Sequence, residues 1–246
     1  MTKTYAIIGD PIDHSLSPLI HNAAFRSLNL DSTYIAYRIQ KNELEVGINA
    51  LKKIKIAGFN VTIPHKTEMM KFLDETDDIC NMCGAVNTVV NNDGVLKGYN
   101  TDVDGFLDPI KKRKITIKDS KVLILGAGGA ARAIIAGMVK EKAGEITISN
   151  RTLKNATELV QFTKNLGGNA TAIPLEEIDQ FISEHKFIIN STSVGLRNES
   201  SLIPTDQIDK NSIVYDIVYT PMNTNLIVNA KKNGATIIYG YEMLLS

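Results

Sequence analysis

The 246-residue chain has few cysteines, no excess charge of either sign and no long apolar run, and each absence excludes a class of protein. Lysine plus arginine and aspartate plus glutamate both number 27, so the net charge does not point to nucleic acid or an anionic membrane as a partner. No apolar run approaches the roughly 20 residues that a membrane-spanning helix needs. The apolar fraction of 43% is instead ordinary for a globular protein.

Cys80 and Cys83 are the only cysteines in the sequence. Their spacing matches half of a zinc ribbon or a redox motif, but no second pair follows and the four histidines are scattered. The surrounding stretch has a helical pattern, in which residues three apart simply share a face. We therefore interpret the spacing as coincidence and expect no metal site.

The first residues lead straight into a strand pattern, with no signal-peptide core and no basic presequence. We therefore expect a cytoplasmic protein. A chain of this length suits two modest domains or one large domain.

Strand and helix patterns alternate through the first hundred residues. The patterns lie at 5–8 (strand), 18–28 (helix), 33–39 (strand), 43–54 (helix) and 56–63 (strand). Two further apolar runs, 85–90 and 95–99, flank Asn92-Asp93-Gly94, which is a hairpin signal. A hairpin beside strands that are joined by helices predicts a mixed sheet in an α/β domain.

The second half of the chain is more regular. A helical pattern over 103–112 precedes six strand patterns, at 121–125, 145–149, 170–173, 187–190, 213–217 and 236–239. Helical patterns separate most of these strands. Such alternation is typical of a Rossmann-like, doubly wound parallel sheet.

A glycine-rich turn follows the first strand of this half. It reads Gly126-Ala127-Gly128-Gly129-Ala130-Ala131 and lies between a strand pattern and a helix pattern. Small residues let the backbone approach a pyrophosphate, which the N-terminus of the helix stabilises. In this context the motif favours a dinucleotide site over a turn that is glycine-rich for steric reasons alone.

The end of the next strand indicates which dinucleotide binds. Sites that prefer NAD usually place an acid there to hold the ribose 2′-hydroxyl. This chain instead reads Asn150-Arg151-Thr152, with Lys154 close behind. A guanidinium can stack on adenine and pair with a 2′-phosphate, so we predict NADP(H) as the cofactor. The alternative is an exposed loop arginine without a ligand.

A lysine follows a proline at the end of the strand pattern over 56–63, in Asn60-Val61-Thr62-Ile63-Pro64-His65-Lys66. Proline suits the first turn of a helix, which would place Lys66 at the positive end of a helix dipole. A cation is disfavoured there, so the position invites a chemical explanation. Asn100-Thr101-Asp102 supplies a carboxylate, and our hypothesis is that Lys66 and Asp102 form a proton-handling pair.

Together these motifs resemble the shikimate dehydrogenase family, NADP-dependent enzymes that reduce 3-dehydroshikimate to shikimate in aromatic amino-acid biosynthesis. The resemblance spans essentially the whole chain and also rests on Ser15-Leu16-Ser17-Pro18, Gly84-Ala85-Val86-Asn87-Thr88 and Gly240-Tyr241-Glu242-Met243-Leu244-Leu245. It implies a substrate-binding and catalytic domain over residues 1–104 and a Rossmann-like NADP domain over 105–240. Residues 241–246 would be a truncated remnant of a C-terminal helix of the first domain.

The resemblance also implies the substrate contacts. Ser15 and Ser17 match positions that bind the shikimate carboxylate, although Ser17 reads equally well as a helix N-cap before Pro18. Thr62, Asn87 and Asp102 match positions that hold the ring hydroxyls beside Lys66, and Tyr219 matches a further substrate-side position. Asn87 falls within an apolar strand pattern, where a buried amide needs partners.

The cofactor contacts implied by the resemblance are Gly126, Ala127, Gly128, Gly129, Ala130, Asn150, Arg151, Thr152, Lys154, Thr192, Ile217 and Gly240. Thr192 belongs to a polar segment at the end of the fourth Rossmann strand, where loops lie against a nicotinamide.

Reducing a ketone requires a hydride at carbon and a proton at oxygen. We expect Lys66 to be the acid/base and Asp102 its partner, and whether Lys66 alone or the pair carries the proton stays open. The family pattern continues beyond Leu245 into a substrate-contacting glutamine and further helices, so we expect intact cofactor binding with weakened catalysis. The expected partner is a small-molecule substrate, with no nucleic acid and no membrane, in a monomer or homodimer. The alternatives are an NAD-using quinate/shikimate dehydrogenase and a low-activity, ligand-binding relative.

Overall fold

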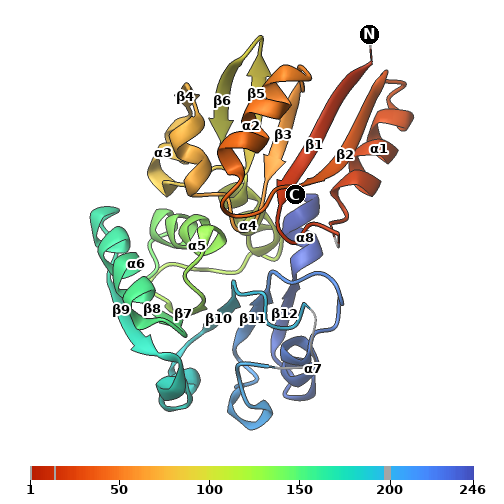
Figure 1. Ribbon diagram of the computed structural model, residues 1–246. Coiled ribbons are helices and arrows are strands. Elements are labelled where there is room, and N and C mark those ends of the chain that lie inside the picture. Colours follow the sequence, from red (N-terminus) through yellow and green to blue (C-terminus); the bar gives the residue numbers. More distant parts are fainter. Residues whose placement is uncertain (1, 14, 197–200) are drawn as a thin grey trace. The chain divides into compact units, whose positions relative to one another are not determined.

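A computed structural model describes residues 2–13, 15–196 and 201–246 (Figure 1). The chain divides into two compact units, Met1–Thr101 and Asp102–Ser246, which are described separately below. Within the described residues, no helix is both long and apolar enough to cross a membrane.

Unit 1 is built on a six-stranded mixed sheet. In chain order its elements are β1 (Lys3–Gly9), α1 (Ser17–Ser27), β2 (Ser32–Arg38), α2 (Leu44–Lys53), β3 (Gly58–Val61), the 3-10 helix η1 (Glu68–Phe72), β4 (Glu75–Thr76), α3 (Asp78–Cys83), β5 (Thr88–Asn92) and β6 (Val95–Tyr99). The strand order is β2-β1-β3-β5-β6-β4, with β1 parallel to β2 and β3, and β5 antiparallel to β3 and β6. The mixed sheet and the β5–β6 hairpin predicted from the sequence are confirmed.

The main core of unit 1 lies between the sheet and α2, and includes Ile8, Leu51, Phe59, Met69 and Leu96. The apolar residues of α2 recur at helical spacing, so one face of the helix is buried while Val46 on the other face stays exposed. Cys80 also belongs to this core, and both cysteines are buried.

The prediction of a helix that begins at Pro64 is wrong. The chain turns there instead, because the His65 backbone N–H donates to the Thr62 carbonyl at 2.9 Å and closes a tight turn around Pro64, whose peptide bond to Ile63 is cis. Only the short helix η1 follows, beginning at Glu68. The helix-dipole argument for Lys66 therefore fails, and the position of this lysine needs another explanation.

Unit 2 is a doubly wound parallel sheet, as the sequence predicts. In chain order its elements are α4 (Asp102–Lys112), β7 (Lys121–Leu125), α5 (Gly129–Lys140), β8 (Glu145–Asn150), α6 (Leu153–Asn165), β9 (Ala170–Pro174), η2 (Leu175–Gln180), η3 (Ile182–Glu184), β10 (Phe187–Asn190), η4 (Thr205–Gln207), β11 (Ile213–Asp216), α7 (Asn225–Lys232), β12 (Thr236–Tyr239) and α8 (Gly240–Leu245). The strand order is β12-β11-β10-β7-β8-β9, and every pair is parallel.

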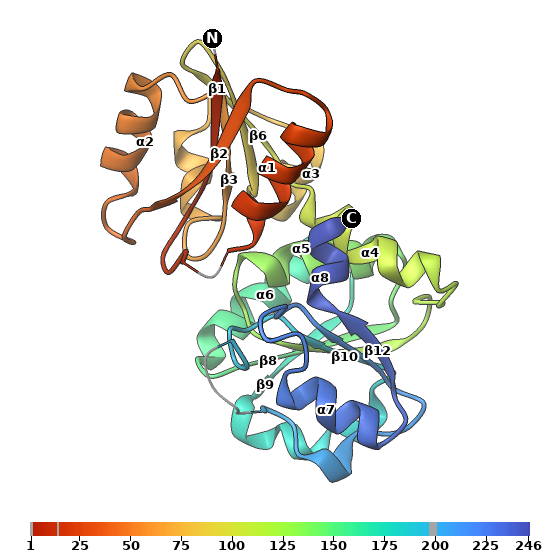
Figure 2. The ribbon, with the colours of Figure 1, turned by 90° about the vertical axis from the view of Figure 1, so that its right-hand side faces the viewer.

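Helices cover both faces of this sheet, with α5 and α6 on one side and α7 on the other (Figure 2). Both faces are therefore buried, which explains why strands such as β7 read as continuous apolar runs. On β7, Leu123 and Leu125 join the core cluster that contains Leu226 of α7. Because all six strands are parallel, the loops that follow them gather at one edge of the sheet, where α/β proteins bind their ligands.

Candidate active site

In unit 1, backbone hydrogen bonds bring two of the predicted substrate residues together. The Val86 N–H donates to the Lys66 carbonyl at 2.8 Å, which places Lys66 against the residue that precedes Asn87. The Asn87 carbonyl accepts from the Val61 N–H at 2.8 Å, and the Asn87 N–H donates to Tyr99 at 3.2 Å. The end of β3, the turn that carries Lys66 and the start of β5 thus converge, with Lys66 half-buried among them.

Thr62 lies directly after β3 and close to the end of β1. Its N–H donates to the Ile8 carbonyl at 2.9 Å. A Cβ on Gly9 would lie 2.5 Å from Cγ2 of Thr62 and 2.8 Å from the Ile63 carbonyl oxygen, so only glycine fits at that position. The segment that leads from β1 to Ser15 and Ser17 begins at this point of close approach.

Ser15 and Ser17 are coupled at the start of α1. The Ser17 N–H donates to the Ser15 hydroxyl oxygen at 3.2 Å, and Pro18 follows in the first turn. The alternative reading of Ser17 as the N-cap is wrong, because Leu16 precedes the helix and Ser17 is its first residue. The first turn of α1 also contains no acidic residue, so this helix N-terminus suits an anion.

Asn87 lies just before β5 and not within a strand, which corrects the sequence prediction. Its amide is nevertheless well partnered, as a partly buried amide requires. Nδ2 donates to the Thr101 hydroxyl at 2.8 Å, while Oδ1 accepts from the Thr101 N–H and the Thr88 hydroxyl, both at 3.0 Å. Thr101 ends unit 1 and Asp102 begins unit 2, so the pairing of Lys66 with Asp102 stays a prediction.

The glycine-rich turn of unit 2 has the shape expected of a dinucleotide site. Gly126 has a φ of +105°, and a Cβ there would lie 2.7 Å from the Ser191 hydroxyl oxygen and 2.9 Å from Cγ2 of Thr192. Gly128 instead faces open space, since no described residue lies within 4 Å of the Cβ it lacks. Among the described residues, no side chain caps α5 and its first turn holds no acid. The first-turn N–H groups can therefore bind a phosphate.

The loop after β8 presents cations and no carboxylate. Arg151, Thr152 and Lys154 are exposed, and Asn150 is half-buried, with its Nδ2 donating to the Thr152 carbonyl at 3.0 Å. The sequence from residue 149 to residue 157 contains no acid. This loop fits a 2′-phosphate better than a 2′-hydroxyl.

Two close contacts link the remaining predicted cofactor residues. Thr192 lies against Gly126, as described above, and Gly240 packs against the backbone carbonyl of Ile217, with no room for a side chain on the glycine. Tyr219 is half-buried in the loop that follows Ile217.

A buried carboxylate that the sequence analysis missed holds these loops in place. Asp216 is fully buried and accepts hydrogen bonds from Asn190 Nδ2 at 2.9 Å, the Val218 N–H at 3.0 Å and the Thr224 hydroxyl at 2.6 Å. Burial raises the pKa of the Asp216 carboxyl, and these three donors oppose that rise. Asn190 in turn accepts from the N–H and the hydroxyl of Thr192. The one available sequence signal was an aspartate at the end of an apolar strand.

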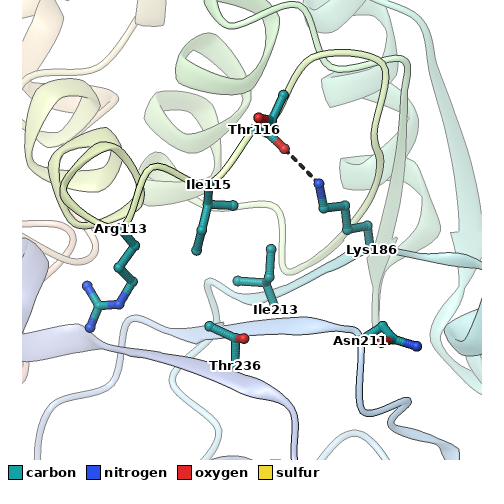
Figure 3. A pocket seen from close by; sticks show the side chains of 7 residues that line it. All are labelled: Arg113, Ile115, Thr116, Lys186, Asn211, Ile213 and Thr236. Atoms are coloured by element: carbon teal, nitrogen blue, oxygen red, sulfur yellow. Dashed lines mark hydrogen bonds between the residues drawn. The ribbon is translucent and has the colours of Figure 1, made fainter.

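A shallow pocket of about 580 Å³ lies at the opposite, amino-terminal edge of the sheet in unit 2 (Figure 3). Its two cations are already engaged, because Arg113 pairs with Glu242 at 2.8 Å and Lys186 Nζ donates to the Thr116 carbonyl at 2.9 Å. The pocket shares no residue with the predicted site. The described residues also contain no cluster of three or more side chains that could hold a metal ion.

Known proteins share this combination of sequence and fold. Residues 7–89 match the family described as the shikimate dehydrogenase substrate binding domain, and residues 109–231 match the family described as shikimate / quinate 5-dehydrogenase. The chain is 62% identical, over its full length and 90% of the relative, to a shikimate dehydrogenase (NADP(+)) of Nitrosopumilus maritimus.

Solved structures agree with the sequence matches. Shikimate dehydrogenase from Aquifex aeolicus has a TM-score of 0.89 at 38% identity, covering 99% of this chain and 88% of that one. Shikimate 5-dehydrogenase from Thermus thermophilus, solved with NADP(H) and shikimate, has a TM-score of 0.85 at 33% identity, covering 98% and 88%. The chain therefore belongs to the shikimate dehydrogenase family.

Proposed function

We propose that this protein catalyses the reversible, NADPH-dependent reduction of 3-dehydroshikimate to shikimate. The observation that carries the proposal is the convergence of Thr62, Lys66 and Asn87 in one corner of unit 1, within a chain that matches the family over its full length. A cation beside hydroxyl and amide groups suits a polyhydroxylated acid whose ketone must be protonated as it is reduced.

Unit 1 supplies the substrate contacts in this proposal. Ser15 and Ser17, at an α-helix N-terminus without acidic residues, hold the carboxylate. Thr62, Asn87 and Asp102 hold the ring hydroxyls, and Tyr219 of unit 2 contributes from the cofactor side. The fixed amide of Asn87 supports its role, because its orientation is set by Thr88 and Thr101 before a ligand arrives.

Lys66 acts as the acid/base. In the direction of reduction its ammonium polarises the carbonyl and donates a proton to the oxygen, and in the direction of oxidation the neutral amine accepts the hydroxyl proton. Asp102 orients the ammonium. The half-buried position of Lys66 supports this role, since the amine can exchange its proton with solvent between turnovers.

Unit 2 supplies the cofactor site, and its residues fit NADP(H). Bound NADPH provides the hydride that adds to the carbonyl carbon. The open face of Gly128 and the uncapped first turn of α5 suit the pyrophosphate, with Ala127, Gly129 and Ala130 completing the turn. Asn150, Arg151, Thr152 and Lys154 suit the 2′-phosphate, while Thr192, Ile217 and Gly240 line the nicotinamide side.

We further infer that residues 1–104 form the substrate domain and residues 105–240 the cofactor domain. A cytoplasmic location is supported by the buried free thiol of Cys80, which suits a reducing compartment. We expect a monomer or a homodimer, which light scattering on the purified protein would distinguish.

Steady-state kinetics test the proposal directly. We expect shikimate-dependent reduction of NADP+, with slower reduction of NAD+ and little activity on quinate in either case. Equal or greater activity with NAD+ and quinate would favour a quinate/shikimate dehydrogenase. Shikimate binding without turnover of either cofactor would mean that the protein is a ligand-binding relative, and would contradict the proposal.

A further inference from the structure

Tyr34 of β2 is held rigidly in the interior of unit 1. Its side chain is only 4% exposed, and its ring stacks on His21 with centroids 4.3 Å apart. Its backbone is fixed by Asn22, which accepts from the Tyr34 N–H at 2.9 Å and donates to the Tyr34 carbonyl at 2.8 Å. His21 and Asn22, which are neighbours on α1, therefore fix the ring of Tyr34 and its backbone in β2.

The phenol of Tyr34 connects two parts of the unit. Its O–H donates to Oδ1 of Asn60 at 2.5 Å, and the side chain of Ser17 hydrogen-bonds to the same phenol. Burial raises the pKa of Tyr34 far above its ordinary value, and the Ser17 hydrogen bond opposes this only in part. The phenol therefore stays neutral and remains a donor.

Beyond Asn60 the hydrogen bonds continue in a defined direction. With Oδ1 occupied by Tyr34, Nδ2 of Asn60 donates to the Asn87 carbonyl at 3.2 Å and to the Thr88 hydroxyl at 3.0 Å. The Thr88 hydroxyl donates to Oδ1 of Asn87, whose Nδ2 then points at Thr101. Rotating the Asn60 amide by 180° would place its Oδ1 opposite the Asn87 carbonyl oxygen, and two acceptors cannot share a hydrogen bond. The side-chain amides of Asn60 and Asn87 therefore each have one favoured orientation.

We propose that Tyr34 is a positioning residue for the substrate site: through Ser17 on one side and Asn60 on the other, it holds the carboxylate-binding serines and the hydroxyl-binding Asn87 in fixed register before the substrate arrives. The inference rests on the proposed function, which assigns substrate contacts to Ser17 and Asn87. Tyr34 is itself buried and acts through its hydrogen-bond partners. Such preorganisation lowers the free-energy cost of ordering polar groups when a small polar ligand binds.

The test is Tyr34→Phe, which keeps the ring and its stacking on His21 but removes the hydroxyl. Asn60 Oδ1 then loses its donor, and Ser17 loses its partner. We expect the KM and Kd for shikimate to rise roughly tenfold, while the KM for NADP+ changes less than about twofold. Isothermal titration with each ligand, alongside steady-state kinetics, separates the two effects.

Tyr215→Phe is the matched control. Tyr215 is also fully buried, but its hydroxyl has no hydrogen-bond partner within the described part of the chain, and it lies in unit 2. Its removal should leave both KM values unchanged. Thr88→Val is a second probe that breaks the same network from the far side, and it should reproduce the selective loss of shikimate affinity.

Unchanged shikimate affinity in folded Tyr34→Phe would overturn the inference. So would an equal loss of affinity for shikimate and NADP+ together with a lower Tm, because that pattern means general destabilisation. If Tyr34→Phe does not fold, Thr88→Val decides by the same two criteria. Failure of the wild-type protein to bind shikimate would instead refute the proposed function, so the two failures are distinguishable.

Discussion

Lys66 is placed by its neighbours, although it lacks the helix that its sequence context suggests. His65 is only 1% exposed, and its Nε2 hydrogen-bonds to the Ile39 carbonyl at 2.7 Å. The Lys66 carbonyl accepts from Val86 on the other side. The backbone of the lysine is therefore anchored to the end of β2 and to the segment that leads into Asn87. This anchoring gives Lys66 the defined position that its proposed role in proton transfer requires, without any contribution from a helix dipole.

Replacing Lys66 by Met should lower kcat by about 10²–10⁴-fold, because the variant has no group that can give or take the proton. The KM for shikimate should stay within about threefold, since the lysine acts mainly in the transition state. Steady-state kinetics in both directions measure the two effects. Lys71→Met is the control, because Lys71 is an exposed lysine of η1 that pairs only with Glu68 among the contacts resolved for it. A near-normal kcat in Lys66→Met would rule out its role as the acid/base.

Arg151 gives a second prediction at the scale of single residues. Arg151→Ala should raise the KM for NADP+ by roughly 10- to 100-fold, because the variant loses the free energy of one charge-assisted hydrogen bond to a phosphate. The KM for NAD+, which has no 2′-phosphate, should change much less. Arg26→Ala removes another exposed arginine, on α1, and should alter neither of these KM values. Equal effects on the two cofactors would mean that Arg151 does not read the 2′-phosphate.

At the scale of elements, the loops that we assign to the nicotinamide side are held by one buried network. Thr224 caps α7 by accepting from the Ile227 N–H at 3.3 Å, and its hydroxyl also donates to Asp216. Asp216 in turn fixes Asn190, which holds Thr192. One threonine therefore couples a helix N-terminus to two loops that carry predicted ligand contacts.

Thr224→Val should lower the free energy of unfolding by about 2–4 kcal/mol, because it removes a helix cap and leaves a buried carboxylate short of a donor. Urea denaturation of the isolated protein measures the change. Thr152→Val is the matched control, since Thr152 also occupies an N-cap position, before α6, but within the described part of the chain its side chain makes no capping hydrogen bond. The account of this network is wrong if the two variants lose similar stability.

The elements that could be predicted from the sequence are those with strong periodicity. The helical stripe before Leu28 and the six apolar runs of the second half correspond to α1 and β7–β12 within a residue or two. Pro64 could not be read correctly, because a proline after a strand suits a helix start and a tight turn equally well. The hydrogen bond from the His65 N–H to the Thr62 carbonyl favours the tight turn over the helix, and this bond depends on how β3 packs beside β1.

The polar networks were beyond sequence reasoning for a different reason. Tyr34 and Asn60 lie 26 residues apart, and their contact requires both the register of the sheet and the rotamer of each side chain. The sequence pattern also suits Ser17 as a helix cap, because it does not reveal that the Ser15 hydroxyl oxygen accepts from the Ser17 N–H. The assignment of substrate and cofactor contacts came from the family resemblance, and periodicity alone would not have given it.

At the scale of the whole molecule, the two units carry different functional groups. The mixed sheet of unit 1 gathers hydroxyls, amides and one lysine, while the parallel sheet of unit 2 presents a glycine turn and two cations at its carboxyl edge. Neither set suffices for the reduction of a ketone, because one lacks a hydride source and the other lacks a proton donor. The proposed activity therefore requires both units of the chain.

The most direct measurement of this claim is isotope transfer within the intact protein. Purified protein is incubated with 3-dehydroshikimate and NADPH that carries deuterium at the transferable position of its nicotinamide, and the product is analysed by mass spectrometry and NMR. We predict shikimate with deuterium on the carbon that was the ketone, and loss of that product in Lys66→Met. Shikimate without deuterium, or no shikimate from the wild-type protein, would contradict the account.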